Sequence, residues 1–195
     1  DPQLGYLTSC PTNTGTGLRA SLMLHLPMLT RFKQMGNVNQ SVAKLGLTMR
    51  GIYGEGSEAL GDLYQVSNQI TLGRREEDII DAVGKQLIDM ESKLRERCRT
   101  QQKAKVEDTL WRSYGALRYA VLMNEKEFMQ HWSNLRLGSA MGILPAPLSV
   151  SDDLLSTAQD AHVKQYAQRN QLELPVEQVR CLLLQEKLKP SEIHS

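Results

Sequence analysis

The side chains in this sequence that could do chemistry together are Cys10, Arg19, Arg50 and Glu55. The first two lie in CPTNTGTGLRAS, where a loop rich in Thr and Gly leads to the arginine, and the other two lie in the glycine-rich RGIYGEGSE. Backbone N–H groups of such loops can approach an anion closely, and an arginine offers a planar fork of donors to phosphate. Two segments of this composition predict a polyphosphate that is held from two sides.

The chemistry that suits this set is phosphoryl transfer to a guanidinium group. A guanidinium is a weak nucleophile, because its charge is delocalised and its pKa lies so far above neutral that it stays protonated. A carboxylate such as Glu55 could align one nitrogen and help remove its proton, while the arginines and Mg²⁺ neutralise phosphate charge. A thiolate at Cys10 would be kept ionised by the guanidinium and would polarise it in return. Taken singly, the glutamate is more often a turn residue, and an arginine at a strand end is more often a surface residue.

The composition excludes several classes of function. The 195 residues are 41% hydrophobic and 23% charged, as in ordinary soluble globular proteins, and carry a formal net charge of +1. This charge gives no case for direct nucleic-acid binding, and no apolar run approaches the roughly 20 residues of a membrane span. The three cysteines are far apart, and no CxxC or HExxH spacing indicates a metal site. We expect a cytoplasmic protein without a membrane or direct nucleic-acid partner.

The elements that must position these residues change character near residue 75. Strands joined by loops are expected at 6–10, 19–26, 47–52 and 63–72, with a helix over 28–45 that Gly36 and Asn37 could interrupt. Further on, helical spacing starts at Glu76 and returns over 105–123, 125–142, 152–170 and 175–189, with Asn124 as a candidate N-cap.

The proline-containing stretch GILPAPLSVSDD, residues 142–153, is the expected boundary between two domains. The predicted fold class is α+β, with a largely antiparallel sheet flanked by helices over residues 1–145. An all-helical C-terminal module over residues 150–195 is expected to follow it. Cys98 and Cys181 fall within helical patterns and are expected to be ordinary core or surface thiols.

The two glycine-rich segments closely resemble the signature regions of the ATP:guanidino phosphotransferases, the creatine and arginine kinase superfamily. The matching stretches are GYLTSCPTNTGTGLRAS, RGIYGEGSEA and QVSNQITLG, and in this form they are most similar to the bacterial protein-arginine kinases. The resemblance covers residues 4–140 and fades in the last part of the chain. It implies that residues 1–145 form the C-terminal part of a guanidino kinase catalytic domain. It further implies phosphorylation of arginine side chains in proteins, which marks them for Clp proteolysis in the stress response.

The resemblance also implies roles for individual residues. Cys10 matches the active-site cysteine whose thiolate lies beside the guanidinium, and Glu55 matches the carboxylate that contacts it. The nucleotide-binding positions are Arg19, Ala20, Ser21, Leu22, Met23, Arg50, Gly51, Ile52, Tyr53, Gly54 and Glu55. ATP and Mg²⁺ are the implied cofactors, and no residue is assigned as a metal ligand. The implied partners are protein substrates, with Clp-system proteins, repressors and a homo-oligomer left open.

Two departures from the family pattern limit these implications. The first catalytic carboxylate of the family, its early nucleotide-binding arginines and a nucleotide-contacting His all lie upstream of the first signature. We therefore expect this chain to be the C-terminal portion of a larger kinase, with little or no activity by itself. The second departure is a degenerate form of the phosphoarginine-binding motif Arg-Asp-x-x-Arg-Ala, at Glu177, Gln178, Arg180 and Cys181, where Arg180 could substitute only in part. Phosphoarginine binding there stays open.

A different class of function also stays open. The chain could be a non-catalytic adaptor or regulatory protein that keeps the nucleotide loops as fold elements and binds nucleotide, phosphoarginine or a Clp-system partner. The missing upstream residues and the degenerate motif favour this alternative. The intact set of Cys10, Arg19, Arg50 and Glu55 opposes it.

Overall fold

The computed structural model describes residues 21–51, 59–68 and 76–189, with side chains from Val83 onward in the last range. The contacts divide the chain into two compact units, Asp1–Arg97 and Cys98–Ser195. The first combines strands and helices and the second is helical, which confirms the predicted α+β class with a helical C-terminal part.

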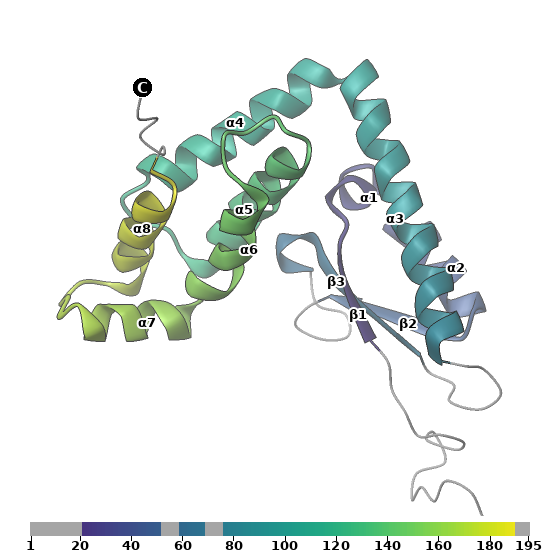
Figure 1. Cartoon of the computed structure of the whole chain (residues 1–195), viewed down its shortest axis with the longest axis horizontal. Coiled ribbons are helices and arrows are strands. Elements are labelled where there is room, and N and C mark those ends of the chain that lie inside the picture. Colours follow the sequence, from purple (N-terminus) through teal and green to yellow (C-terminus); the bar gives the residue numbers. More distant parts are fainter. Residues whose placement is uncertain (1–20, 52–58, 69–75, 190–195) are drawn as a thin grey trace, which may run out of the picture. The chain divides into compact units, whose positions relative to one another are not determined.

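The first unit contains a three-stranded antiparallel sheet in the order β1-β3-β2 (Figure 1). Its strands are β1 (Ser21–His25), β2 (Leu47–Gly51) and β3 (Leu63–Asn68). All three fall inside predicted strands, whereas the stretch 6–10 lies outside the described residues. Because β3 pairs with both neighbours, it brings the two predicted phosphate-binding segments into one register.

One face of this sheet packs against helices. Leu22, Leu24 and Val66 share this face because side chains alternate along a strand. A Cβ atom on Gly84 would lie 3.2 Å from Leu22 Cδ2, so the glycine lets helix α3 (Glu76–Gln101) lie close to β1. The other helical elements of the unit are α1 (Pro27–Arg31), α2 (Met35–Lys44) and the 3₁₀ turn η2 (Leu60–Asp62).

The prediction of one helix over 28–45 is wrong in its detail. The stretch forms two helices, α1 and α2, and the chain turns at Phe32–Gln34 instead of at Gly36. Lys33 adopts a left-handed backbone conformation with φ of 55°, and its N–H and that of Gln34 close the end of α1. A left-handed residue at a helix end is usually glycine, so a lysine at this position gave no sequence signal that the helix ends here.

The second unit contains five helices in the part that the structure describes: α4 (Lys103–Tyr119), α5 (Glu125–Ala140), α6 (Leu148–Thr157), α7 (Asp160–Arg169) and α8 (Val176–Lys187). Asn124 is confirmed as the N-cap of α5, since its Oδ1 accepts a 2.9 Å bond from the Glu127 N–H. The predicted helix over 152–170 is instead two helices that meet at Ala158 and Gln159. At the centre, the buried Trp132 donates from Nε1 to the Ser151 carbonyl at 2.6 Å.

The expected domain boundary at 145–150 falls between α5 and α6. These two helices pack against each other, and the bond from Trp132 to Ser151 joins them. The contacts divide within α3 instead, between Arg97 and Cys98. The assignment of residues 1–145 and 150–195 to separate domains therefore stays a prediction.

Candidate functional site

The structure describes five of the predicted site residues. Ser21, Leu22 and Met23 form the start of β1, and Arg50 and Gly51 form the end of β2. The others lie outside the described residues: Cys10, Arg19, Ala20, Ile52, Tyr53, Gly54 and Glu55. The described parts of both segments therefore lie on one sheet, on either side of β3.

The register brings a row of side chains together across the sheet. Met23 on β1 and Arg50 on β2 both pair with Gln65 on β3. In antiparallel strands, directly opposite residues project to the same face, so these three side chains share a face. In the next row, Ser21 and Thr48 both pair with Ser67 on that same face.

We call these two rows the polar sheet face, made up of Ser21, Met23, Thr48, Arg50, Gln65 and Ser67. It is opposite to the face that Leu22 and Val66 turn toward the helices. Met23 is 52% exposed and Gln65 is also exposed, so a ligand can reach the first row. Since neighbouring strands lie about 4.8 Å apart, β1 and β2 are about 10 Å apart, and groups on both can contact one polyphosphate.

The donor types on this face fit a nucleotide phosphate chain. Arg50 brings a permanently charged guanidinium, Ser21 brings an exposed hydroxyl group and Gln65 brings an amide, whereas the hydroxyl oxygen of Thr48 is buried. The face contains no carboxylate among the described residues, and no described group of His, Cys, Asp or Glu side chains could hold a metal ion. Because Mg²⁺ in such sites is held largely by phosphate oxygens and water, these residues fit the phosphates and not the metal.

Gln65 received no role from sequence reasoning. It lies inside QVSNQITLG, but a glutamine in a strand has no chemical pattern of its own. Only the register shows that it lies between Met23 and Arg50 on the polar sheet face. Alternation with the buried Val66 was the one local signal that Gln65 projects away from the core.

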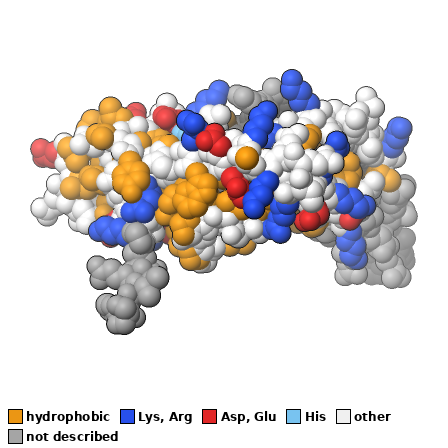
Figure 2. All heavy atoms as spheres, turned by 90° about the horizontal axis from the view of Figure 1, so that it is seen from above, with side chains coloured by type: hydrophobic (Ala, Val, Ile, Leu, Met, Phe, Trp, Pro, Cys, Tyr) orange, Lys and Arg blue, Asp and Glu red, His pale blue; other side chains and the backbone are white. Residues whose placement is uncertain are grey.

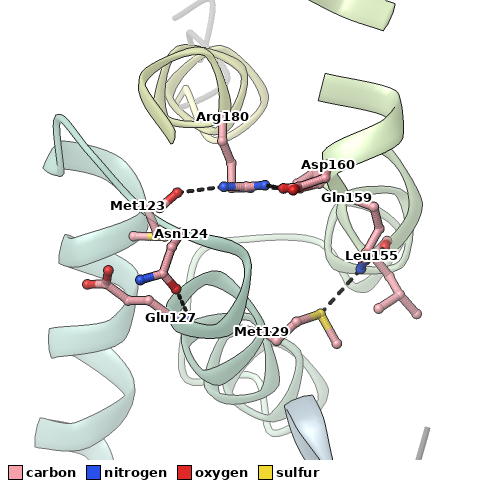
Figure 3. A network of polar contacts seen from close by, with 9 residues as sticks. Met123, Asn124, Glu127, Met129, Leu155, Gln159, Asp160 and Arg180 are labelled. Atoms are coloured by element: carbon pink, nitrogen blue, oxygen red, sulfur yellow. Dashed lines mark hydrogen bonds and ion pairs between the residues drawn. The ribbon is translucent and has the colours of Figure 1, made fainter. Parts of the chain in front are cut away.

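The degenerate motif on α8 has a buried arginine (Figure 3). Arg180 is 1% exposed and donates from Nε to the Ala158 carbonyl at 2.9 Å and from Nη1 to the Met123 carbonyl at 2.6 Å. Its Nη2 forms an ion pair with Asp160 at the start of α7. The guanidinium therefore ties α8 to neighbouring segments, which is a structural role, and the partial ligand role considered from sequence stays a prediction.

The neighbouring residues of that motif differ in exposure. Cys181 is buried, and burial raises the pKa of its thiol, with the Arg180 charge opposing this. Cys98 is buried as well, so both are core thiols, as expected. Glu177 is exposed at the start of α8, and its carbonyl accepts a bond from the Met123 N–H at 3.3 Å.

Exposed apolar side chains follow the end of α4 in the second unit. Tyr119, Val121 and Leu122 are well exposed, and the Arg118 guanidinium lies 5.2 Å from the centre of the Tyr119 ring. Figure 2 shows hydrophobic side chains at the surface among Lys and Arg side chains. Large exposed apolar patches mark protein interaction sites, and these exposed side chains are candidates for part of one.

Comparison with known proteins extends these observations. Residues 1–94 match the family described as ATP:guanido phosphotransferase, C-terminal catalytic domain. Residues 103–195 match the family described as protein-arginine kinase McsB C-terminal domain. The first match ends within α3 and the second begins with α4, so the division between the compact units, at Arg97 and Cys98, lies between them. The sheet with its polar face thus belongs to a guanidino phosphotransferase catalytic domain, and the helical unit belongs to a domain that accompanies it.

The curated relatives are protein-arginine kinases. The chain is 48% identical to that of Caldanaerobacter subterraneus subsp. tengcongensis over 84% of this chain and 50% of the relative. It is 44% identical to that of Clostridium novyi over 98% of this chain and 57% of the relative. The chain belongs to the protein-arginine kinase family of ATP:guanido phosphotransferases. It spans about half the length of the curated relatives it matches.

Proposed function

We propose that this chain forms part of a kinase that transfers the γ-phosphoryl group of ATP to arginine side chains of proteins. The observation that carries the proposal is the polar sheet face, where Met23, next to the first glycine-rich segment, and Arg50, at the start of the second, both pair with Gln65. Family membership supports the same activity. The relatives at 43–48% identity are protein-arginine kinases.

The proposed roles follow the chemistry of the transfer. Arg19 and Arg50 neutralise phosphate charge, and the backbone at 20–23 and 51–54 lines the nucleotide. Glu55 holds the substrate guanidinium, and Cys10 beside it tunes its charge. The bond between the γ-phosphorus and the ADP oxygen breaks, a bond from the guanidino nitrogen to phosphorus forms, and Glu55 helps remove the proton from that nitrogen.

Two groups absent from the chain itself are required. ATP supplies the phosphoryl group, and Mg²⁺ would supply charge neutralisation in the transition state. Gln65 donates an amide hydrogen bond to the nucleotide from the centre of the polar sheet face.

The wider role proposed is marking of proteins for Clp proteolysis during stress in the cytoplasm, with Clp-system proteins and repressors as partners. This part rests on the resemblance of the signature segments alone. A homo-oligomer is also proposed, and the exposed Tyr119, Val121 and Leu122 support an interaction surface in the second unit. No described helix combines the length and the apolar sequence that crossing a bilayer requires.

The test combines the chain with Mg-ATP and an arginine-rich protein, with and without the upstream kinase portion. Phosphorus NMR detects the acid-labile phosphoarginine. We expect a signal with the upstream portion present, and Glu55→Ala and Cys10→Ala should each lower the rate by about 100-fold or more. Arg50→Ala should weaken ATP binding, whereas Arg112→Ala, which removes an exposed arginine of α4, should not.

The outcome also decides between the two classes of function. Absence of phosphoarginine in both mixtures, with both portions folded and associated, would contradict the catalytic proposal. Retained binding of MgATP under those conditions would then favour the non-catalytic adaptor.

A further inference from the structure

The end of β1 leads directly into helix α1. Among the described strands, β1 pairs with β3. Leu26 is the single residue between the end of β1 and the start of helix α1. The placement of residues 26–29 therefore bears directly on the placement of β1, which starts with Ser21 of the first phosphate-binding segment.

Glu91 of α3 holds the start of α1. Its Oε1 and Oε2 accept bonds from the Met28 N–H at 3.1 and 3.2 Å, and Oε2 accepts a further bond from the Leu29 N–H at 3.1 Å. The first N–H groups of a helix lack partners within the helix and are usually satisfied by a Ser, Thr, Asp or Asn at the N-cap. Here Leu26 occupies that position and has no side-chain acceptor, so a carboxylate 63 residues away takes its place.

The carboxylate is itself fixed. Glu91 is 3% exposed, and the Nε of Arg95, one turn further along α3, donates to its Oε1 at 3.1 Å. Both oxygens are therefore engaged and compensated, which is the condition under which a buried charge is tolerated.

Two further bonds complete the junction. The Leu26 N–H donates to the Asp62 carbonyl at 2.9 Å, and the Thr30 hydroxyl lies 3.0 Å from the Tyr64 hydroxyl on β3. The exit of β1 is thus attached to η2, to β3 and, through Glu91, to α3. In the attachment to α3, one side chain, that of Glu91, accepts all three backbone bonds.

We infer that Glu91 is a positioning residue for nucleotide binding, because it fixes the exit of β1 and with it the first phosphate-binding segment. This inference rests on the proposed function. Glu91 itself need not touch the nucleotide. A glutamine at the same place has one acceptor oxygen and would turn an NH₂ group toward backbone donors, so it cannot reproduce the contacts.

The experiment compares Glu91→Gln with Asp89→Asn in the chain combined with its upstream kinase portion. Asp89 lies on the same helix but is 60% exposed and pairs with Lys93 at 2.6 Å, so it is a matched control. MgATP affinity is measured by titration with a fluorescent ATP analogue, and amide hydrogen exchange is followed over residues 21–29. We expect Glu91→Gln to weaken nucleotide affinity by about fivefold and to speed exchange in β1, with Asp89→Asn like the unchanged protein.

The two readouts separate positioning from mere stability. Faster exchange at Met28 and Leu29 with unchanged nucleotide affinity would overturn the inference, because Glu91 would then only stabilise the fold. If the unchanged protein binds no MgATP while its β1 amides are protected, the proposed function fails and the inference fails with it.

A second variant covers the case in which Glu91→Gln does not fold. Glu91→Asp keeps a carboxylate but withdraws it by one methylene group. We expect a smaller loss of affinity in the same direction, with faster exchange at Met28 and Leu29. Unchanged affinity in this folded variant, despite faster exchange, would overturn the positioning role.

Discussion

Each of the two units buries one charged side chain that forms hydrogen bonds with backbone groups at a helix end, and the two charges have opposite signs. In the part of the chain that the structure describes, the buried charged residues are Glu91 in the first unit and Arg180 in the second. Glu91 accepts bonds from backbone N–H groups at the start of α1, whereas Arg180 donates to the Ala158 carbonyl at the end of α6. The sign of each charge matches the helix end that it serves, since helix starts favour anions and helix ends favour cations.

Glu91 and Arg180 differ in the elements that their hydrogen bonds fix. Glu91 secures the exit of a strand that carries part of the candidate nucleotide site. Arg180 secures helices to one another, through Met123 before α5 and Asp160 of α7, in a unit to which we assign no catalytic group. A buried charge is therefore weak evidence of a functional site by itself, and the element that it fixes decides what it means.

The largest expected effect on stability comes from removing the buried guanidinium of Arg180 in the second unit. Arg180→Met removes the guanidinium and leaves two backbone carbonyls and Asp160 without it, which should lower the free energy of unfolding by about 3 kcal/mol. Urea unfolding followed by tryptophan fluorescence reports on this unit, because both tryptophans, Trp111 and Trp132, lie in it. Arg136→Met is the control: its pair with Asp152 is partly exposed, so we expect a loss below about 1 kcal/mol. Equal losses would contradict the structural role of Arg180.

A pair of glycines tests packing in the same unit. A Cβ on Gly138 of α5 would lie 2.5 Å from Leu144 Cδ1, so Gly138→Ala should destabilise the unit by about 2 kcal/mol. Gly115 of α4 has open space at the same position, and Gly115→Ala should stabilise the unit by about 0.5 kcal/mol. The same urea experiment measures both. A stabilising Gly138→Ala would mean that Leu144 can move aside freely.

The pH dependence of stability tests the role of the buried Glu91 carboxyl group in the first unit. Burial raises the pKa of the Glu91 carboxyl, although Arg95 and the backbone bonds oppose the rise. A raised pKa of an acid means that its contribution to folding is fully present below the pKa of the unfolded chain and is lost as pH rises through the folded pKa. The stability advantage of the unchanged protein over Glu91→Gln should therefore decrease as pH rises above the ordinary pKa of a glutamate carboxyl, about 4.3.

Hydrogen exchange of the β3 amides, measured at several pH values, gives this difference for the first unit. Comparison with Asp89→Asn removes the contribution of other carboxyl groups. An advantage that grows with pH would show that the N–H groups and Arg95 outweigh burial at Glu91.

The smallest expected effects come from three helix ends, one in the first unit and two in the second. Lys33 after α1 and Gln171 after α7 both have φ near 54–55°, a conformation that glycine adopts without strain. Lys33→Gly and Gln171→Gly should each stabilise their unit by about 0.5–1 kcal/mol. Gly142 after α5 has φ of 68°, and Gly142→Ala should have the opposite effect. Thermal unfolding of each variant checks the three signs.

Much of the fold could be predicted because it rests on local patterns. Alternation in RASLMLHL and the acidic start at Glu76 predicted β1 and α3, and Asn124 predicted the start of α5. The chemistry of the candidate site was also local, since glycines, arginines and a carboxylate lie within two short segments. Its geometry was not local: the shared register of Met23, Gln65 and Arg50 depends on the pairing of β3 with both other strands.

Two helices were predicted as one in each unit, and both errors have a tertiary cause. Glycine at 36 offered a local reason for a break, yet it lies within α2, and the break falls at Lys33, after a helix whose start is fixed by Glu91. Between α6 and α7, the Ala158 carbonyl is bonded by Arg180 from α8. Each contact joins residues more than 20 positions apart, beyond the reach of helical periodicity.

The sequence by itself determined the fold class, the family and the residue types available for phosphoryl transfer, because these depend on composition and short-range spacing. Only the tertiary structure decided that Arg180 is a buried structural residue and that Gln65 lies between the two signature segments. It also decided that a glutamate on α3 completes the start of α1. The physical reason is that unsatisfied backbone groups must find partners on folding, and which distant side chain satisfies them follows from packing.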